Sequence, residues 1–185
     1  MLFDTACQAG FGRGTYLHAV GDGAVWIDRQ VAKQFGAQGH YLIDLFHVCE
    51  YLGAAASGCA GDVSKKNWLE KQKALLKDGQ AQNVIDGLKP FLEPEAEEDS
   101  NAPVRACHRY LSNRIGQLDY PSALAKGLPV GSGEIESAHR YIIQERLKLP
   151  GAWWSPDNAR NMLALRVLRG NNQWENYWRN NTEMQ

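Results

Sequence analysis

The pattern of apolar and polar positions predicts a strand, a helix and a second strand near the start of the chain. A short apolar run covers Tyr16–Val20, apolar residues recur at mostly helical spacing over 25–35, and a second run, GHYLID, ends at Asp44. Such a unit usually lays its two strands in parallel, with functional groups at their carboxyl ends. Asp22, between two glycines just past the first strand, occupies such a position.

From Leu45 onward the pattern predicts helices. Ser64 and Gly79 supply start and stop signals for one of them. The acidic, proline-bearing stretch Glu93–Pro103 is the one obvious break, and we interpret it as a surface linker within a helical insertion. The segments expected to be helical are 45–56, 64–79, 81–93, 104–118, the segment that carries Glu136, 155–170 and 171–180.

The composition fits one soluble globular domain. The length of 185 residues and the hydrophobic content of 44% support a single core. No apolar run approaches the ~20 residues of a membrane span, and the first residues lack the pattern of a signal peptide, so we expect a cytoplasmic protein without a membrane partner. The cysteines form no CxxC pair and are expected to be buried thiols: Cys7, Cys49, Cys59 and Cys107.

The formal net charge of -1 hides an asymmetry between the two parts of the chain. Residues 1–100 carry 9 Lys+Arg against 14 Asp+Glu, whereas residues 101–185 carry 11 against 7, and nine of those eleven cations are arginines. Arginine suits phosphate groups, so a DNA-binding face in the second part is allowed, with ordinary solvated helix faces as the alternative. The candidate DNA contacts are Arg140, Arg146, Lys148 and Arg160.

The segment KGLPVGSGEIESAHRYIIQERLK places two glutamates in the first turn of a predicted helix. Ser132 is a good N-cap, and either carboxylate would complement the helix dipole. Helical spacing predicts a buried stripe of Ile135, Ala138 and Ile142. Glu134 and Glu136 fall on opposite edges of that stripe, so geometry alone does not choose between them as functional residues.

Asp22 and Glu136 could converge if the helix packs across the sheet. Carboxylate oxygens suit Mg²⁺, and two such ions ~3.5–4 Å apart support phosphoryl transfer. The simpler interpretation of Asp22 is a turn aspartate beside glycine. Asp44 and His47, three residues apart at a strand-to-helix junction, can form a hydrogen-bonded pair.

Three other features have simpler explanations. A metal site that joins His47 to Cys49 or Glu50 lacks a second ligand pair at zinc spacing. The glycine-rich stretch 10–14 precedes a strand and lacks the ending of a phosphate-binding loop, so we treat it as an ordinary loop. The tryptophans of the second part could stack on bases, but core packing is the commoner role of such residues: Trp153, Trp154, Trp174 and Trp178.

Four strings occur in order over most of the chain: GDGAVWI, YLIDLFHVCEYL, YPSALAKGLPVGSGEIESAHRYIIQERLKLPGAWWS and NMLALRVLRGNNQWENYW. Together they resemble the DDE transposases of bacterial insertion sequences, specifically the Kra-type group, which is related to Mutator-like transposases. The resemblance implies an α/β fold with an RNase H-like catalytic core, three acidic ligands and two Mg²⁺ ions. It also implies DNA as partner, both the insertion-sequence ends and the target, and allows a homo-oligomer.

The resemblance assigns roles to individual residues. The aspartate of GDGA is Asp22, and the glutamate of GSGxxES is Glu136, so Glu136 rather than Glu134 is the implied metal ligand and catalytic residue. Asp44 and His47 match the Asp/Cys-x-x-His motif of Mutator-like relatives, which supports the site without providing one of the three ligands.

One departure from the family pattern matters. In the family, the first aspartate lies on the opening strand of a three-strand meander, and a helix and the strand with the second aspartate follow. Only one helix and one strand separate Asp22 from Asp44, so Asp22 matches the second aspartate, and the one earlier carboxylate, Asp4, leaves no room for the meander. We therefore expect the C-terminal part of a transposase, N-terminally truncated and without the first catalytic aspartate.

The expected organisation is one partial catalytic domain over 1–185. It comprises a strand-helix-strand core at 15–50, a large helical insertion at 51–128, and C-terminal catalytic and aromatic helices at 129–185. The expected function is DNA transposition by metal-dependent strand cleavage and strand transfer, with this chain alone inactive or nearly so. The alternatives are a non-catalytic DNA-binding or assembly remnant, and a decayed reading frame that folds only marginally.

Overall fold

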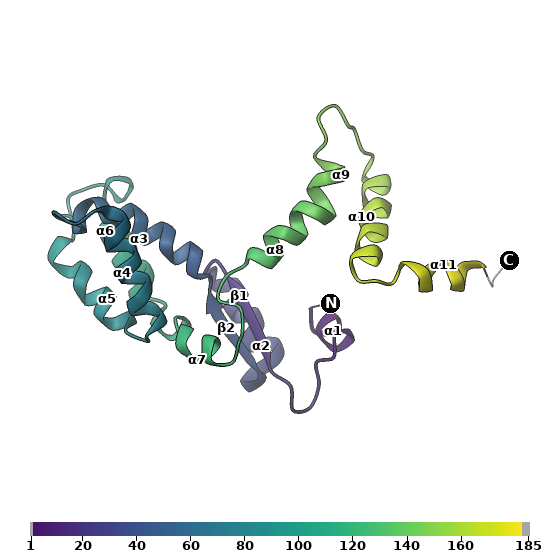
Figure 1. Cartoon of the computed structure of the whole chain (residues 1–185), viewed down its shortest axis with the longest axis horizontal. Helices are drawn as coiled ribbons and strands as arrows, with labels where there is room; N and C mark the ends of the chain where they lie inside the picture. Colours follow the sequence, from purple (N-terminus) through teal and green to yellow (C-terminus); the bar gives the residue numbers. More distant parts are fainter. Residues whose placement is uncertain (1, 183–185) are drawn as a thin grey trace. The chain divides into compact units, whose positions relative to one another are not determined.

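The computed structural model describes residues 2–182, apart from the side chains of Glu134, Asn181 and Thr182. It divides into two compact units that meet in the chain between Ser132 and Gly133 (Figure 1). The main elements of the first unit are α1 (Leu2–Gln8), β1 (Leu17–Gly21), α2 (Val25–Phe35), β2 (Gly39–Ile43), α3 (Leu45–Cys59), α4 (Lys65–Lys77), α5 (Ala81–Leu88), α6 (Pro103–Ser112) and α7 (Tyr120–Ala125). Short 3₁₀ turns cover Gly36–Gln38, Lys89–Phe91, Asp99–Asn101 and Ile115–Gln117.

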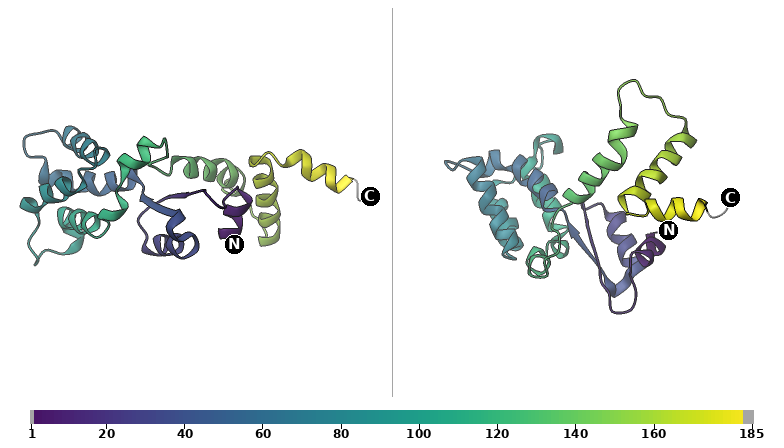
Figure 2. Two further views of the ribbon diagram at one scale, coloured as in Figure 1. Left: turned by 90° about the horizontal axis from the view of Figure 1, so that it is seen from below. Right: turned by 45° about the vertical axis from the view of Figure 1, so that its right-hand side comes forward.

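The predicted strand-helix-strand unit is confirmed. β1 and β2 pair in parallel, in a register that runs from Leu17 opposite Gly39 to Gly21 opposite Ile43. Helix α2 connects the strands and packs against them (Figure 2), burying Val31. The described residues contain this two-stranded sheet and are otherwise mostly helical.

The core of the first unit lies where α3, α4, α5 and α6 pack together. Helix α3 begins at the carboxyl end of β2 and extends between α4 and α6, so it joins the sheet to the helical part (Figures 1 and 2). Burial of one large apolar side chain stabilises a fold by about 1.5–3 kcal/mol. The largest fully buried side chains include Leu52, Leu76, Leu88, Leu111 and Tyr120.

Several helix starts follow the sequence signals. Ser64 Oγ accepts a hydrogen bond from the amide of Asn67 at 3.2 Å and caps α4, as predicted. Two helices were not predicted. Asp119 caps α7 by accepting from the amide of Ser122. Helix α1 buries no residue of its own and is held by Phe3, whose ring lies 5.8 Å from that of Phe11, a tertiary contact that local spacing does not reveal.

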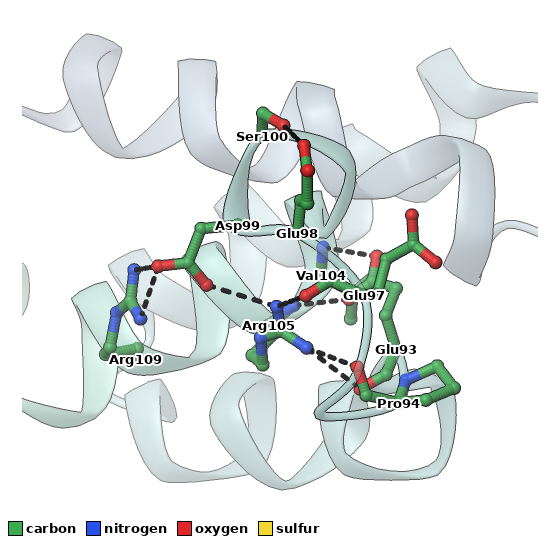
Figure 3. A network of polar contacts seen from close by, with 9 residues as sticks. All are labelled: Glu93, Pro94, Glu97, Glu98, Asp99, Ser100, Val104, Arg105 and Arg109. Carbon is green, nitrogen blue, oxygen red and sulfur yellow. Dashed lines mark hydrogen bonds and ion pairs between the residues drawn. The ribbon is translucent and has the colours of Figure 1, made fainter.

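The acidic stretch Glu93–Pro103 is an exposed connection with an ordered interior (Figure 3). The carboxylate of Glu93 accepts hydrogen bonds from the amides of Val104 at 2.9 Å and Arg105 at 2.7 Å. These two N–H groups lie in the first turn of α6, where the helix itself offers them no partner. The guanidinium of Arg105 sits inside the turn and donates to the carbonyl oxygens of Glu93, Pro94 and Glu97 and to the carboxylate of Asp99. A single cation therefore organises a stretch whose composition suggested a plain surface linker.

The second unit is built from helices. α8 (Gly133–Ala138), a π-helical stretch (His139–Gln144) and α9 (Glu145–Leu147) follow one another without a break, and α10 (Pro156–Gly170) and α11 (Trp174–Thr182) complete the unit (Figure 1). Ser155, the first residue of the segment 155–170 that was expected to be helical, caps α10 by accepting from the amide of Asn158. Within the described part of the chain, no helix is both long and apolar enough to cross a membrane.

The predicted buried stripe of the Glu136-bearing helix is wrong in this unit. Ile135 is 70% exposed, Ala138 is exposed and Ile142 is only half-buried. Part of the reason is the π-helical stretch that begins at His139, because its wider turn breaks the α-helical spacing from which the stripe was derived.

Candidate functional site at the carboxyl end of the sheet

The two strands of the first unit end beside each other, each followed by an aspartate. Gly21 is paired with Ile43, so Asp22 and Asp44 are the next residues of neighbouring parallel strands. The amide of Asp44 donates to the carbonyl oxygen of Gly21 at 2.7 Å, which continues the pairing past the last register position. The two aspartates differ sharply in their surroundings, since Asp22 is exposed and Asp44 is buried.

The backbone around Asp22 is held from several directions. The Tyr110 hydroxyl donates to the carbonyl oxygen of Asp22 at 2.9 Å, and Arg114 Nε donates to the carbonyl oxygen of Gly23 at 3.0 Å. The amide of Gly23 donates to the Tyr41 hydroxyl at 2.9 Å. Asp22 Oδ1 accepts from the amide of Ala24 at 2.9 Å, while Oδ2 has no hydrogen-bond partner within residues 2–182. The backbone of Asp22 is thus fixed, and one of its carboxylate oxygens is available to bind a ligand.

Gly23 is required by this arrangement. Its φ of +83° favours glycine, and a Cβ atom at this position would lie 2.5 Å from the Tyr110 hydroxyl oxygen. The glycine after the candidate ligand therefore lets the loop approach the helical part closely.

A row of stacked side chains connects α3 and α6 to the Asp22 loop. The rings of Tyr51 and Tyr110 stack with their centroids 4.0 Å apart, and the guanidinium of Arg114 lies 4.4 Å from the Tyr110 ring centroid. The His47 ring contacts both tyrosines edge-on, at 5.5 and 5.8 Å. Burial raises the pKa of Tyr110, so its hydroxyl stays protonated and donates to Asp22. His47 is thus connected to the Asp22 loop through the Tyr110 side chain.

Asp44 is fully engaged in structural hydrogen bonds. Its Oδ1 accepts from the amide of Phe46 at 2.7 Å and caps α3, and its Oδ2 accepts from the amide of Ser132 at 2.8 Å and from the Ser132 hydroxyl. Burial works to raise the pKa of this carboxyl. The hydrogen bonds from Ser132 and from the backbone amides of Phe46 and His47 outweigh it and hold the pKa below its ordinary value. Asp44 is therefore an ionised structural anchor with little capacity left for a metal.

The expected side-chain pair of Asp44 and His47 is not formed. His47 Nδ1 lies 3.0 Å from Glu50 Oε2, three residues further along α3. The physical reason is competition, since Asp44 accepts from backbone amides and from Ser132 and leaves the imidazole to the next carboxylate along the helix.

The segment 130–132 is tied to the junction of β2 and α3. The amide of Leu45 donates to the carbonyl oxygen of Val130 at 2.9 Å, next to the two bonds that Ser132 makes with Asp44. A Cβ atom on Gly131 would lie 2.7 Å from the Phe46 ring. The first glycine of the GSG motif thus serves a close approach of two segments, and the Ser132 hydroxyl donates to Asp44, although capping was its predicted role.

Glu136 lies on α8 in the second unit, and its side chain is exposed. The side chain of Glu134 lies outside the described part, so the preference for Glu136 over Glu134 stays a prediction. The candidate DNA contacts Arg140, Arg146, Lys148 and Arg160 are all exposed, and Arg160 forms a surface ion pair with Asp157 at 3.1 Å.

The tryptophans do not form a buried core within the second unit. Trp153 is 97% exposed, and Trp154 and Trp174 are half-buried. Trp178 lies with its ring centroid 5.5 Å from that of Trp174, so the aromatic residues of α11 pack mainly on one another. Core packing was the favoured interpretation, and it is wrong within this unit, where α10 itself buries no residue.

Arg166 is a residue whose role the sequence did not reveal. Its Nε donates to the carbonyl oxygen of Ile142 at 2.9 Å, its Nη2 donates to the carbonyl oxygen of Tyr141, and Nη2 also lies 3.1 Å from Glu145 Oε2. Both carbonyl groups belong to the π-helical stretch, where the shifted hydrogen bonding leaves acceptors available. An arginine in the middle of α10 therefore holds the two antiparallel segments of this unit together.

Potential metal ligands are numerous in the sequence, but the described part of the chain does not gather them into a cluster. Between residues 2 and 182, no three His, Cys, Asp or Glu side chains are grouped to hold a metal ion. Cys59 and Cys107 are buried as expected, and burial raises the pKa of Cys107 to about 12, which rules it out as a thiolate nucleophile near neutral pH. Cys7 is exposed and Cys49 is half-buried, so the expectation of four buried thiols is wrong for these two.

Comparison with known proteins shows the family of this chain. No curated protein and no solved structure matches the chain. One family model matches residues 13–181, which include β1, β2 and every candidate site residue discussed above. The chain therefore belongs to the uncharacterised protein family UPF0236.

Proposed function

We propose that this chain is part of a DDE-type transposase and that Asp22 and Glu136 belong to its metal-dependent phosphoryl-transfer site. The observation that carries the proposal is the state of Asp22. Its loop is held by bonds to the hydroxyl groups of Tyr110 and Tyr41, while its Oδ2 is available at the carboxyl end of a parallel strand pair. Functional groups of α/β folds are usually found at such strand ends. A parallel strand-helix-strand unit is also what an RNase H-like core would require here.

The connection to Glu136 comes through Ser132. This residue is bound to Asp44 at the end of β2, and Glu136 follows it by four positions. Four residues span at most about 14 Å even when extended, so the chain itself limits how far Glu136 can lie from Ser132. The anchor therefore supports the assignment of Glu136 to the same site as Asp22.

The donor chemistry of the two carboxylates fits Mg²⁺, which prefers a few carboxylate oxygens together with water and phosphate oxygens. Asp22 and Glu136 would hold the ion, and Asp44 would not, because both of its oxygens already accept hydrogen bonds. An ion held there would supply activation of the attacking oxygen and stabilisation of the leaving oxygen in phosphoryl transfer. The contribution of the chain is to fix the Asp22 backbone through Tyr110 and Arg114.

The proposal is tested by measuring strand nicking and strand transfer with a longer member of the family. Asp22→Ala and Glu136→Ala, placed at the matching positions, are expected to abolish Mg²⁺-dependent nicking of DNA while both variants still fold, as a cooperative thermal unfolding transition would show. Asp62→Ala, at an exposed loop position, is the matched control and should nick normally. Wild-type nicking by either site variant would remove that residue from the site.

The purified chain gives a second test. With two carboxylates of an implied three, we expect salt-dependent DNA binding and no nicking. DNA binding without nicking in the longer family member as well would favour a non-catalytic DNA-binding or assembly role. Mg²⁺-dependent nicking by the chain alone would contradict the expected need for a third carboxylate.

A further inference from the structure

We propose that Arg114 is a positioning residue that binds a phosphate of the DNA backbone beside Asp22. The inference rests on the proposed function, because it takes DNA as the ligand. The inference goes beyond the proposed function because it assigns a DNA contact to the helical part of the first unit, where the sequence suggested none.

A pocket of ≈ 240 Å³ lies next to the Asp22 loop. It is formed where the turn after β1 and the first turn of α2 meet the segment that follows α6. Gly23, which directly follows Asp22, is part of its wall, so a group bound here lies beside the candidate metal ligand. The lining residues are Gly23, Val25, Asp28, Asn113, Arg114 and Gln117.

Arg114 is held in one orientation in this pocket. Its Nε donates to the carbonyl oxygen of Gly23, its guanidinium lies over the Tyr110 ring, and its Nη1 is 3.4 Å from the carbonyl oxygen of Tyr110. Across the described residues, Nη2 makes no hydrogen bond and no carboxylate lies within ion-pair distance of the guanidinium. A permanently charged donor is thus pre-oriented with one edge unused, and a phosphate oxygen is the partner that this edge fits best.

Asp28 is the one carboxylate that lines the pocket, and Asn113 and Gln117 add two amides. Such polar side chains can also recognise the edges of bases. The phosphate is favoured because Arg114 is bonded to the residue after Asp22, and phosphoryl transfer at Asp22 requires the DNA backbone, rather than a base, at this place. The two modes of binding differ in a measurable way, since a phosphate contact carries no sequence preference.

The experiment measures the affinity of the purified chain for fluorescently labelled DNA duplexes of unrelated sequence, by anisotropy at several salt concentrations. Each phosphate contact contributes about 0.9 to the slope of log K against log salt. Arg114→Gln is expected to lower that slope by about 0.9 and to weaken binding equally for all sequences. Arg114→Lys should keep most of the slope. Arg109→Gln is the matched control, because Arg109 lies on the adjoining α6, is exposed and pairs with Asp99.

A second variant leaves Arg114 in place, in case its replacement prevents folding. Asn113→Asp puts a carboxylate into the pocket beside the guanidinium, and we expect the same fall in slope. Asn83→Asp adds the same charge at an exposed position of α5 and should have no such effect.

Three results would overturn the inference. An unchanged slope for both pocket variants, with normal binding by the wild type, removes Arg114 from the DNA contacts and leaves the proposed function standing. A loss of affinity confined to one duplex sequence would assign the pocket to base recognition instead. A wild-type chain that binds no DNA at all would remove the proposed function at its first step, and this inference with it.

Discussion

Ser132 donates to a single carboxylate oxygen, Asp44 Oδ2, from both its backbone amide and its hydroxyl, although the two residues are 88 positions apart. The other oxygen, Oδ1, accepts from the amide of Phe46 at the start of α3. One buried carboxylate therefore ties together the end of β2, the start of α3 and the segment that leads into α8. Removal of the Asp44 carboxylate should therefore weaken the contacts among all three segments.

Ser132→Ala should destabilise the first unit by about 1.5–3 kcal/mol, the usual contribution of a hydrogen bond to a charged group. Stability is lost because the Asp44 carboxylate is buried and keeps its charge, while it loses the hydrogen bond that the Ser132 hydroxyl donates. Denaturant unfolding of the chain measures it. Ser137→Ala, five positions later and exposed, is the control and should be close to neutral. Equal unfolding midpoints for the two variants would show that the hydroxyl contributes nothing.

Asp44 should make stability depend on pH in a specific direction. Its pKa is held below the value of about 3.9 for an unfolded chain, so its contribution is complete above that pH and is lost as the pH falls below about 4 toward the folded-state pKa. The difference in unfolding free energy between wild type and Asp44→Asn should therefore be largest near neutral pH and shrink in acid. Asp62→Asn, at an exposed loop position, is the matched control for the loss of one carboxylate.

Gly23→Ala should be among the most destabilising single changes in the Asp22 loop. A positive φ costs a non-glycine residue about 1–2 kcal/mol, and the new methyl group would also meet Tyr110, which adds about 1–3 kcal/mol of overpacking. Gly127→Ala separates the two effects, because Gly127 has a φ of +65° and its new methyl group would meet no described atom within 4 Å beyond the adjacent residues. Thermal unfolding should rank Gly23→Ala clearly below Gly127→Ala, and the reverse order would contradict the close approach of Tyr110.

Arg105→Ala should disorder the acidic stretch Glu93–Pro103. Its guanidinium donates to backbone carbonyl groups inside the turn, and without it four acidic side chains would repel one another there: Glu95, Glu97, Glu98 and Asp99. Limited proteolysis with a glutamate-specific protease should cut this stretch faster in the variant. Arg109→Ala removes an arginine whose guanidinium, among the residues that the structure describes, hydrogen-bonds to the Asp99 side chain and to no backbone carbonyl group. Its cleavage rate should stay near that of the wild type.

The local elements were largely predictable, because their signals lie within a few residues. The parallel unit follows from apolar runs and glycines, and the structure moves β1 by one residue relative to the prediction. Ser64 and Ser155 cap helices as their positions predicted. Helix α7 was missed although Asp119 and Pro121 give ordinary start signals.

Tertiary contacts account for what the sequence did not reveal. Arg166 bonds to two carbonyl groups of the π-helical stretch, 24 and 25 positions away, and no local pattern reveals these contacts. The partner of Asp44 was expected to be His47, at helical spacing, but it is Ser132, and no local pattern connects those two residues. Asp22 was correctly placed just past a strand end, whereas the contributions of Tyr110 and Arg114 come from a distant helix. The catalytic roles of Asp22 and Glu136 stay predictions.

The hydrogen bonds that join Asp44 to Ser132 and Leu45 to Val130 have a consequence for how relatives of this chain can differ in length. The helices between Leu45 and Gly131 leave the sheet and return to it at the same junction, since Leu45 bonds to Val130 and Asp44 to Ser132. The entropy of closing a flexible loop rises slowly, by about 0.6 kcal/mol for each doubling of length. Residues could therefore be added to the exposed connections between these helices at little cost, provided that the bonds of Asp44 to Ser132 and of Leu45 to Val130 are kept. Family members of different lengths could then share one junction.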